Sequence, residues 1–319
     1  MNIVVTHSEP GAGRAWVEAL TAQLPQARIA LDPVSPDGKD AEAPAAEGWA
    51  HWAVGWHPSA DFFERQPGLR AFFSTGAGVD HLLRHPGLPA ALPVIRLEDA
   101  GMAEAMADYC LHALLDIAGR HDCYRLQQGS QRWLEQRPLA RSELPVGVVG
   151  MGVLGAHVAR MLAAAGFPVR GYARTPRAVE GIPVLHGAAQ WDAFLAATRV
   201  LILLAPHTPE TENLIDARAL ARLAPGGWLI NVARGALVVE ADLLAALDEG
   251  RLAGAVLDVF RQEPLPAQHP FWHHPRIRLT PHVSAPTQVA ASAVQVAAKL
   301  AALSRGELVS GQVDRSRGY

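Results

Sequence analysis

Residues 150–155 read Gly-Met-Gly-Val-Leu-Gly, between the apolar run 146–149 and an Ala-rich stretch. A G-x-G-x-x-G turn between a strand and a helix is typical of a dinucleotide site. The first glycine makes the tight turn, the second lets the backbone approach a pyrophosphate, and the third lets the helix pack closely. The helix N-terminus adds free amides and a partial positive charge. We therefore predict a cofactor-binding loop of Gly150, Met151, Gly152, Val153, Leu154 and Gly155.

The end of the next expected strand, 167–173, indicates which dinucleotide is bound. NAD-binding folds place an Asp or Glu there to bind the ribose 2′-hydroxyl. This strand ends in Ala173-Arg174-Thr175, without a carboxylate. Arg174 can form a charge-assisted fork to a 2′-phosphate, and Thr175 can add a hydroxyl. The sequence favours NADP(H), with NAD(H) as the alternative. It leaves open whether Arg174 or Arg177 meets the phosphate, or whether Arg174 is an ordinary surface cation.

Three polar segments follow later strands, at 231–235, 257–264 and 280–284. Ligands of open α/β sheets bind beyond the carboxyl ends of the strands. Arg234, Glu263 and His282 can therefore converge on one crevice. Taken singly, such an Arg is usually a surface residue and such a His a structural one.

These segments require a scaffold of alternating strands and helices. Short β-branched or aromatic runs alternate with Ala/Leu-rich stretches, which is typical of parallel α/β layers. Strands are expected at 2–6, 50–55, 69–74, 93–97, 144–150, 167–173, 200–204, 228–232 and 253–259. Helices are expected at 11–24, 102–120, 153–165, 192–197, 216–222, 240–250 and 287–305. The segment 33–48 is turn-rich and is expected to be exposed, and 127–141 is a polar segment.

Composition excludes several classes of protein. Of 319 residues, 50% are hydrophobic and 18% charged, which excludes a disordered chain. A net charge of -3 gives no basic field, so we expect no nucleic-acid partner. Two cysteines, Cys110 and Cys123, exclude a disulfide framework. Neither a long apolar run nor a signal peptide is evident, so we expect a cytoplasmic protein without a membrane partner. The histidines at 269–274 lack a zinc-ligand pattern, so no metal site is predicted.

Together these motifs resemble the D-isomer specific 2-hydroxyacid dehydrogenase family, from the Ser74–Asp80 motif to Pro281-His282. Within it the chain is most similar to the glyoxylate/hydroxypyruvate reductase A subgroup, through residues 56–58, 101–104 and 313–319. The resemblance implies two doubly wound parallel-sheet domains, a Rossmann cofactor domain (99–285) inserted into a flavodoxin-like substrate domain (1–98 with 286–319). It also implies a homodimer, built largely around the long helix after residue 100.

The resemblance implies roles for the three polar side chains. Arg234 would bind the substrate carboxylate and polarise the keto oxygen, because a guanidinium stays charged and offers several donors in one plane. His282 would protonate that oxygen as hydride arrives, and an ordinary imidazole pKa of about 6.5 suits this task. Glu263 would bind the other imidazole nitrogen. The implied activity is NADPH-dependent reduction of small 2-keto acids, such as glyoxylate or hydroxypyruvate, to D-2-hydroxy acids.

Further site residues are implied in the same way. Asp258 would engage the nicotinamide carboxamide. The adenosine side would be lined by Ala205, Pro206 and Thr208, and the nicotinamide side by Val232 and Ala233. Substrate would also contact Gly76, Ala77, Gly78 and Trp56, although Trp56 can equally serve domain packing. Ser284 and Pro286 replace the small apolar residues common after the catalytic histidine, so substrate preference stays open. The alternatives are a non-enzymatic nucleotide-sensing, protein-binding module and an NAD-dependent dehydrogenase of a different 2-hydroxy acid.

Overall fold

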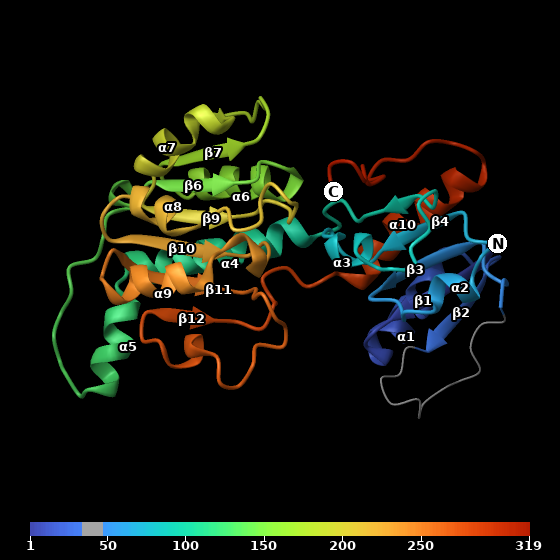
Figure 1. Ribbon diagram of the computed structural model, residues 1–319, viewed down its shortest axis with the longest axis horizontal. Coiled ribbons are helices and arrows are strands. Elements are labelled where there is room, and N and C mark those ends of the chain that lie inside the picture. Colours follow the sequence, from blue (N-terminus) through green and yellow to red (C-terminus); the bar gives the residue numbers. More distant parts are fainter. Residues whose placement is uncertain (34–46) are drawn as a thin grey trace. The chain divides into compact units, whose positions relative to one another are not determined.

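The structure, a computed structural model, describes residues 1–33 and 47–319, so most of the turn-rich segment predicted at 33–48 lies outside the described residues. Contacts divide the chain into unit 1, Met1–Gly101 with Thr287–Tyr319, and unit 2, Met102–Pro286. The sequence places these divisions after residues 98 and 285. Each unit is an α/β domain built on its own parallel sheet, which confirms the predicted fold class (Figure 1). No helix in the described part of the chain is long and apolar enough to cross a membrane.

Unit 1 contains a five-stranded sheet of order β2-β1-β3-β4-β5. Its paired strands are all parallel. The strands are β1 (Asn2–His7), β2 (Arg28–Pro33), β3 (Trp52–Trp56), β4 (Ala71–Ser74) and β5 (Val94–Ile95). The helices are α1 (Pro10–Gln23), α2 (Phe62–Arg65), α3 (Asp80–Leu83) and α10 (Val289–Ser304). The C-terminal helix α10 belongs to this unit, together with the tail that follows it.

Unit 2 contains a seven-stranded sheet of order β12-β11-β10-β9-β6-β7-β8. Its strands are β6 (Val146–Val149), β7 (Val169–Ala173), β8 (Val184–His186), β9 (Val200–Leu203), β10 (Gly227–Asn231), β11 (Leu252–Leu257) and β12 (Ile277–Leu279). Its helices are α4 (Met102–Ala118), α5 (His121–Gly129), α6 (Val153–Ala164), α7 (Ala188–Ala196), α8 (Ala217–Arg222) and α9 (Glu240–Asp248), with short 3-10 turns η1 (Arg141–Glu143), η2 (Gly235–Leu237) and η3 (Pro270–His273). Strand order reverses between β6 and β9, the position at which such sheets bind ligands.

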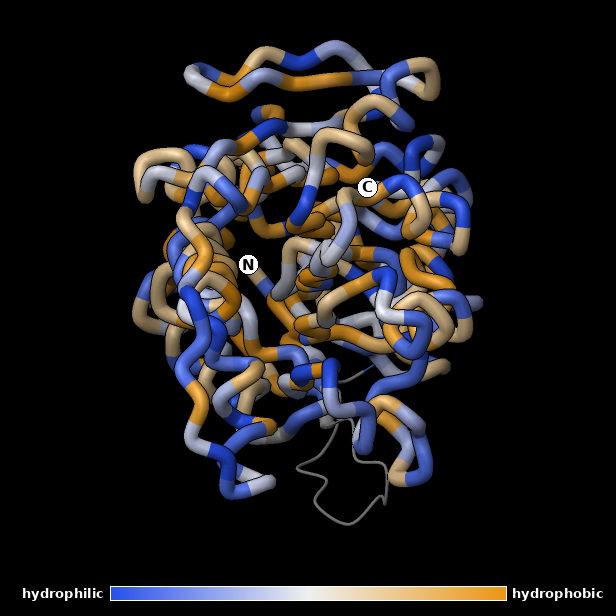
Figure 2. The backbone as a smooth tube through the Cα atoms, turned by 90° about the vertical axis from the view of Figure 1, so that its left-hand side faces the viewer, coloured by the Kyte–Doolittle hydropathy of each residue, from blue (hydrophilic) through white to orange (hydrophobic). Residues whose placement is uncertain are grey.

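The central strands of unit 2 are buried on both faces, as expected of a parallel sheet covered by helices. All four residues of β6 and of β9 are buried. Leu201 and Leu203 of β9 enter one core cluster, whereas Val200 and Ile202 enter the other. Apolar stretches, in orange, alternate with hydrophilic ones, in blue, along the chain trace (Figure 2). This burial fixes where each strand ends, and so where each following loop begins.

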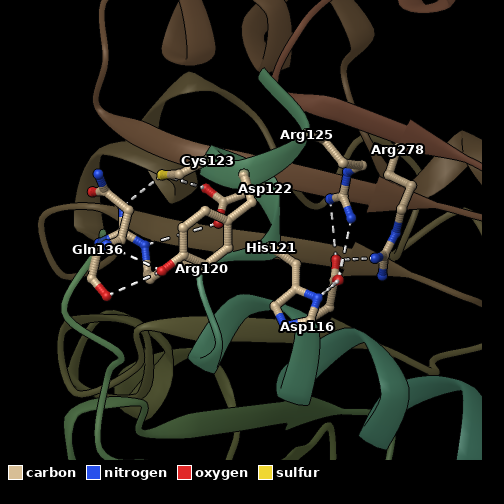
Figure 3. Close-up of polar contacts among 9 residues, drawn as sticks. Asp116, Arg120, His121, Asp122, Cys123, Arg125, Gln136 and Arg278 are labelled. Atoms are coloured by element: carbon tan, nitrogen blue, oxygen red, sulfur yellow. Dashed lines mark hydrogen bonds and ion pairs between the residues drawn. The ribbon is translucent and has the colours of Figure 1, made fainter. Parts of the chain in front are cut away.

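Helix α5 is an element that the sequence analysis did not predict. None of its residues is buried, so it lacks the apolar stripe that would reveal it. It is attached instead through Asp116 of α4, whose carboxylate accepts two hydrogen bonds of 3.1 Å from Arg125 (Figure 3). Arg278 of β12 also pairs with Asp116, and His121 Nδ1 lies 3.7 Å from it. One nearly buried carboxylate therefore connects α4, α5 and β12.

Candidate active site

The three glycines of the loop after β6 have the three different surroundings that a dinucleotide cradle needs. Gly150 adopts φ 98°, and a Cβ atom there would lie 2.4 Å from the Ala205 nitrogen. A Cβ on Gly155 would lie 1.8 Å from the Gly150 oxygen, so only glycine allows α6 to approach the turn. A Cβ on Gly152 would meet nothing within 4 Å. The first and third glycines thus shape the turn, and the second leaves open space beside the uncapped start of α6, where the sequence predicts the diphosphate.

Arg174 and Thr175 directly follow β7, where the sequence predicts the 2′-phosphate contact. Arg174 is about half exposed, and its Nη1 lies 4.0 Å from Glu210 Oε2. A hydrogen bond from Thr208 lowers the pKa of Glu210 below its usual value, helped by a backbone hydrogen bond and by attraction to Arg174. Glu210 comes from the loop after β9, which also holds the buried Ala205 and Thr208. Sequence reasoning missed this carboxylate, because it considered only the end of β7.

His282 and Glu263 form a direct hydrogen-bonded pair. Glu263 Oε2 lies 2.7 Å from His282 Nδ1, and Glu263 Oε1 accepts the N–H of Phe260 at 2.9 Å. Burial alone would raise the pKa of Glu263, but the hydrogen bonds from His282 and Phe260 outweigh it, helped by attraction to His282 and Arg234. The net effect holds the Glu263 pKa below its usual value, so the carboxylate is ionised at neutral pH. The ionised carboxylate thus occupies Nδ1, and proton transfer through the other imidazole nitrogen stays a prediction.

Asp258 organises the loop that carries His282. Its carboxylate is fully buried and accepts hydrogen bonds from Thr280 Oγ1 (2.6 Å) and from the N–H groups of Val283 and Ser284 (both 2.8 Å). His282 itself adopts φ 55°, an uncommon conformation for a side chain other than glycine. The Asp258 contacts hold the residues on both sides of this backbone. A contact of Asp258 with the nicotinamide carboxamide stays a prediction.

Arg234 follows β10 at the start of the 3-10 turn η2. The Asn231 side chain accepts the N–H of Ala233 at 3.1 Å and donates to the Arg234 carbonyl at 3.0 Å, which fixes the turn locally. Val232 and Ala233 are buried, whereas Arg234 is half-buried. Since β10, β11 and β12 are neighbours in the sheet, the loops after them carry Arg234, Glu263 and His282 at one edge of it.

The substrate-binding residues predicted from unit 1 also lie beyond the carboxyl ends of strands. Trp56 ends β3, and Gly76, Ala77 and Gly78 follow β4. A Cβ on Gly76 would lie 2.4 Å from Trp56 Cζ3, so the indole packs directly on this glycine. The His81 ring lies 3.9 Å from the indole ring, centroid to centroid. Trp56 therefore packs within its own unit, whatever its role towards substrate.

Two of the histidines at 269–274, His269 and His274, each lie beside one carboxylate. His269 Nε2 lies 3.4 Å from Glu240, and His274 Nε2 lies 3.3 Å from Asp248. Among the residues that the structure describes, no group of three or more His, Cys, Asp or Glu side chains is arranged to hold a metal ion.

A dinucleotide cradle at the reversal of strand order, with Arg, Glu and His at adjacent strand ends, defines a dinucleotide-dependent oxidoreductase. Residues 111–284 match the NAD binding domain of the D-isomer specific 2-hydroxyacid dehydrogenases. The chain belongs to this family, whose members are oxidoreductases acting on 2-hydroxy acids. This confirms the family predicted from the sequence.

Relatives cover the whole chain. It is 42% identical over 324 residues, with 100% of both chains covered, to the glyoxylate/hydroxypyruvate reductase A of Serratia proteamaculans (strain 568). A D-isomer specific 2-hydroxyacid dehydrogenase of Xanthobacter autotrophicus Py2, solved with NADPH and MES, superposes with a TM-score of 0.92 at 38% identity, covering 99% of each chain. An NADPH-dependent glyoxylate/hydroxypyruvate reductase of Sinorhizobium meliloti, solved with NADP and sulfate, gives 0.90 at 35% identity, covering 100% of this chain and 99% of the other. The similarity to the reductase A subgroup is likewise confirmed.

Proposed function

We propose that this protein is an NADPH-preferring reductase that converts small 2-keto acids of the glyoxylate and hydroxypyruvate type into D-2-hydroxy acids. The observation that carries this proposal is the hydrogen-bonded His282–Glu263 pair, at the same sheet edge as Arg234. The relatives support it, since that of Serratia proteamaculans is named for this activity and that of Sinorhizobium meliloti contains NADP.

The three side chains divide the chemistry among them. Arg234 binds the substrate carboxylate and polarises the keto oxygen with its permanently charged fork of donors. The imidazole of His282 donates the proton that the oxygen needs, through the nitrogen not bound to Glu263. Glu263 stabilises the charged imidazole and fixes its orientation. When bound, the reduced nicotinamide supplies the hydride.

The remaining site residues bind and orient. The glycine loop holds the diphosphate, and Arg174 with Thr175 binds the 2′-phosphate. Ala205, Pro206 and Thr208 line the adenosine side, and Val232, Ala233 and Asp258 the nicotinamide side. The backbone amides of Gly76, Ala77 and Gly78, and the indole of Trp56, contact the substrate. This assignment explains why a Cβ on Gly152 would meet nothing within 4 Å.

The test is the loss of NADPH absorbance on addition of a panel of 2-keto acids, repeated with NADH. We expect turnover of glyoxylate and hydroxypyruvate with a higher kcat/KM for NADPH. In His282→Ala turnover should fall strongly while NADPH still binds. Flat traces across the panel with both cofactors would favour the protein-binding alternative, and a clear preference for NADH would favour the NAD-dependent dehydrogenase.

We propose further that the protein is a homodimer and that the segment 119–140 contributes to its interface. This segment is closed at its base by a hydrogen bond from the Leu139 N–H to the Ala118 carbonyl (2.9 Å). Between these points Trp133 is fully exposed, and Leu126 and Leu134 are about half exposed. Large apolar side chains on such a projecting segment are suited to cover by a second copy. Light scattering after gel filtration should give a dimer mass, and Trp133→Ser should weaken the dimer.

A further inference from the structure

We propose that Arg261 is a positioning residue that holds the turn carrying Arg234, so that binding of the substrate carboxylate depends on it. The inference rests on the proposed function of Arg234. Arg261 itself is not required to touch the substrate.

The turn after Arg234 needs anchors from outside itself. Arg234 is extended, with φ -144° and ψ 142°, and the three-residue turn η2 follows at once. Its own backbone closure is limited to bonds such as Leu237 N–H to the Arg234 carbonyl at 3.3 Å. Short 3-10 turns have poor hydrogen-bond geometry. The Arg234 guanidinium donates from Nη1 to the Ala233 carbonyl at 2.8 Å, and the position of the Arg234 backbone depends on how residues 235–238 are held.

The guanidinium of Arg261 supplies such an anchor. Its Nε donates to the Val238 carbonyl at 3.0 Å, and its Nη2 donates to the same oxygen at 2.6 Å. Nη2 also donates to the Ala236 carbonyl at 3.1 Å and to Asn213 Oδ1. Charged donors make hydrogen bonds roughly twice as strong as neutral ones. The Arg261 side chain thus holds two carbonyls of the turn and also the neighbouring segment at Asn213.

Two further contacts show that the turn is fitted to this anchor. A Cβ on Gly235 would lie 1.9 Å from the Phe260 carbonyl carbon and 2.3 Å from the Arg261 nitrogen, so the turn lies directly on this peptide. The N–H of Asn213 donates to the Ala236 carbonyl at 2.9 Å, from the segment that Arg261 also contacts. Asn231 holds the chain before Arg234, and Arg261 holds it after.

Arg261 also lies two residues before Glu263. The segment that positions the partner of His282 is therefore the segment that holds the turn of Arg234. This arrangement keeps the carboxylate-binding group and the proton donor in a fixed relation. A displacement of about 1 Å in such an arrangement can cost about 100-fold in rate.

The experiment compares Arg261→Met and Arg261→Lys with Arg160→Met, a control that removes an exposed arginine of α6 for which the structure records no bond. For Arg261→Met we expect kcat/KM for glyoxylate to fall about 10- to 100-fold, with the KM for NADPH changed less than about 2-fold. Arg261→Lys should recover only part of the loss, because it keeps the charge but not the fork. Wild-type activity in Arg261→Lys would overturn positioning in favour of simple charge attraction.

The dependence of activity on salt concentration also distinguishes positioning from simple charge attraction. Raising salt from about 0.1 M to about 1 M shortens the screening length from about 10 Å to about 3 Å. A positioning effect predicts the same ratio of Arg261→Met to wild type at both concentrations. A ratio that approaches one at high salt would overturn the proposal.

A readout without turnover keeps this inference separate from the proposed function. Hydrogen exchange of the amides at 235–239 in the cofactor-free protein should be faster in Arg261→Met and unchanged in Arg160→Met. Unchanged exchange in Arg261→Met would overturn the anchoring, as would a general loss of protection across residues 102–286. A wild-type protein that reduces no 2-keto acid would refute the proposed function, while the exchange result would still decide whether Arg261 holds the turn.

Discussion

Replacement of Glu263 by Gln removes the charge beside His282 and keeps the shape of the side chain. With the charge centres about 4 Å apart, the attraction is about 1 kcal/mol in water and about 4 kcal/mol at an effective dielectric constant of about 20. The side chains of His282 and Glu263 are 44% and 35% exposed, so solvent screening places the value between these limits. About 1.5–3 kcal/mol corresponds to about 1–2 pH units. The pH profile of the reaction rate should therefore move by about that amount.

The sign of the effect differs between the two directions of reaction. Reduction needs the protonated imidazole, so its rate falls as pH rises, and in Glu263→Gln this fall should occur about 1–2 pH units lower. Oxidation of the 2-hydroxy acid needs the neutral imidazole, so its rise should move to lower pH by the same amount. Since the Glu263 pKa lies below its usual value, the carboxylate of the wild type stays charged throughout the pH range in which these rates change.

The assay is kcat/KM for glyoxylate and for the hydroxy acid across pH at saturating cofactor. Asp248→Asn is the matched control, because it removes a carboxylate 3.3 Å from His274 in the same unit. Its profile should superpose on that of the wild type. Superposed profiles for Glu263→Gln would refute the electrostatic role of Glu263, even if the absolute rate fell.

Four further substitutions test three separate parts of the molecule. Arg234→Ala should lower kcat/KM for the keto acid about 100- to 1000-fold with little change in the KM for NADPH, and an effect confined to NADPH would contradict carboxylate binding. Arg174→Ala should raise the KM for NADPH about 10- to 100-fold more than the KM for NADH. Glu210→Gln should lower the KM for NADPH, because it removes a carboxylate charge 4.0 Å from Arg174. Equal effects on the KM values of both cofactors would argue against a 2′-phosphate site. Asp116→Asn should destabilise the protein by about 1–3 kcal/mol in thermal or urea unfolding. Burial raises the pKa of Asp116, but Arg125 and the other cations lower it by more, so the net pKa lies below its usual value. The carboxylate therefore contributes its full stability above its unfolded pKa. The difference in unfolding free energy between wild type and variant should narrow as the pH falls through the folded pKa.

The parts of the fold that sequence predicted are those with strong burial. Strands β6 and β9 are continuous apolar runs because both of their faces are covered. The three strands that the sequence analysis missed, β2, β8 and β12, all lie at edges of their sheets. All residues of β8 and β12 are only half-buried, so they carry no comparable apolar signal. Burial leaves a record in residue type: the edge strand β5 was predicted because both of its residues are buried, whereas the half-buried edge strands β8 and β12 leave no such record.

The site residues likewise divide into those that the sequence could predict and those that it could not. The glycine loop was predictable because its backbone conformation and close approaches require particular residue types, as at Gly150 and Gly155. The contacts of Arg261 were not, since its partners in the turn are backbone carbonyls, which every residue possesses. Two of the three hydrogen bonds to the Asp258 carboxylate likewise come from backbone N–H groups. A side chain that acts on the backbone of a neighbouring loop has no partner residue type for a motif to record.

Three side chains of the segment 258–263 contact neighbouring loops because of where β11 lies. It follows the strand between β10 and β12, so its side chains reach the loops on both sides. Asp258 holds the loop that carries His282, and Glu263 binds the His282 ring. Arg261 holds the turn after Arg234. Substitutions in one short segment should therefore fail in different ways. Loss of Glu263 moves the pH profile, whereas loss of Arg261 weakens use of the keto acid at every pH, and this separation follows from strand order alone.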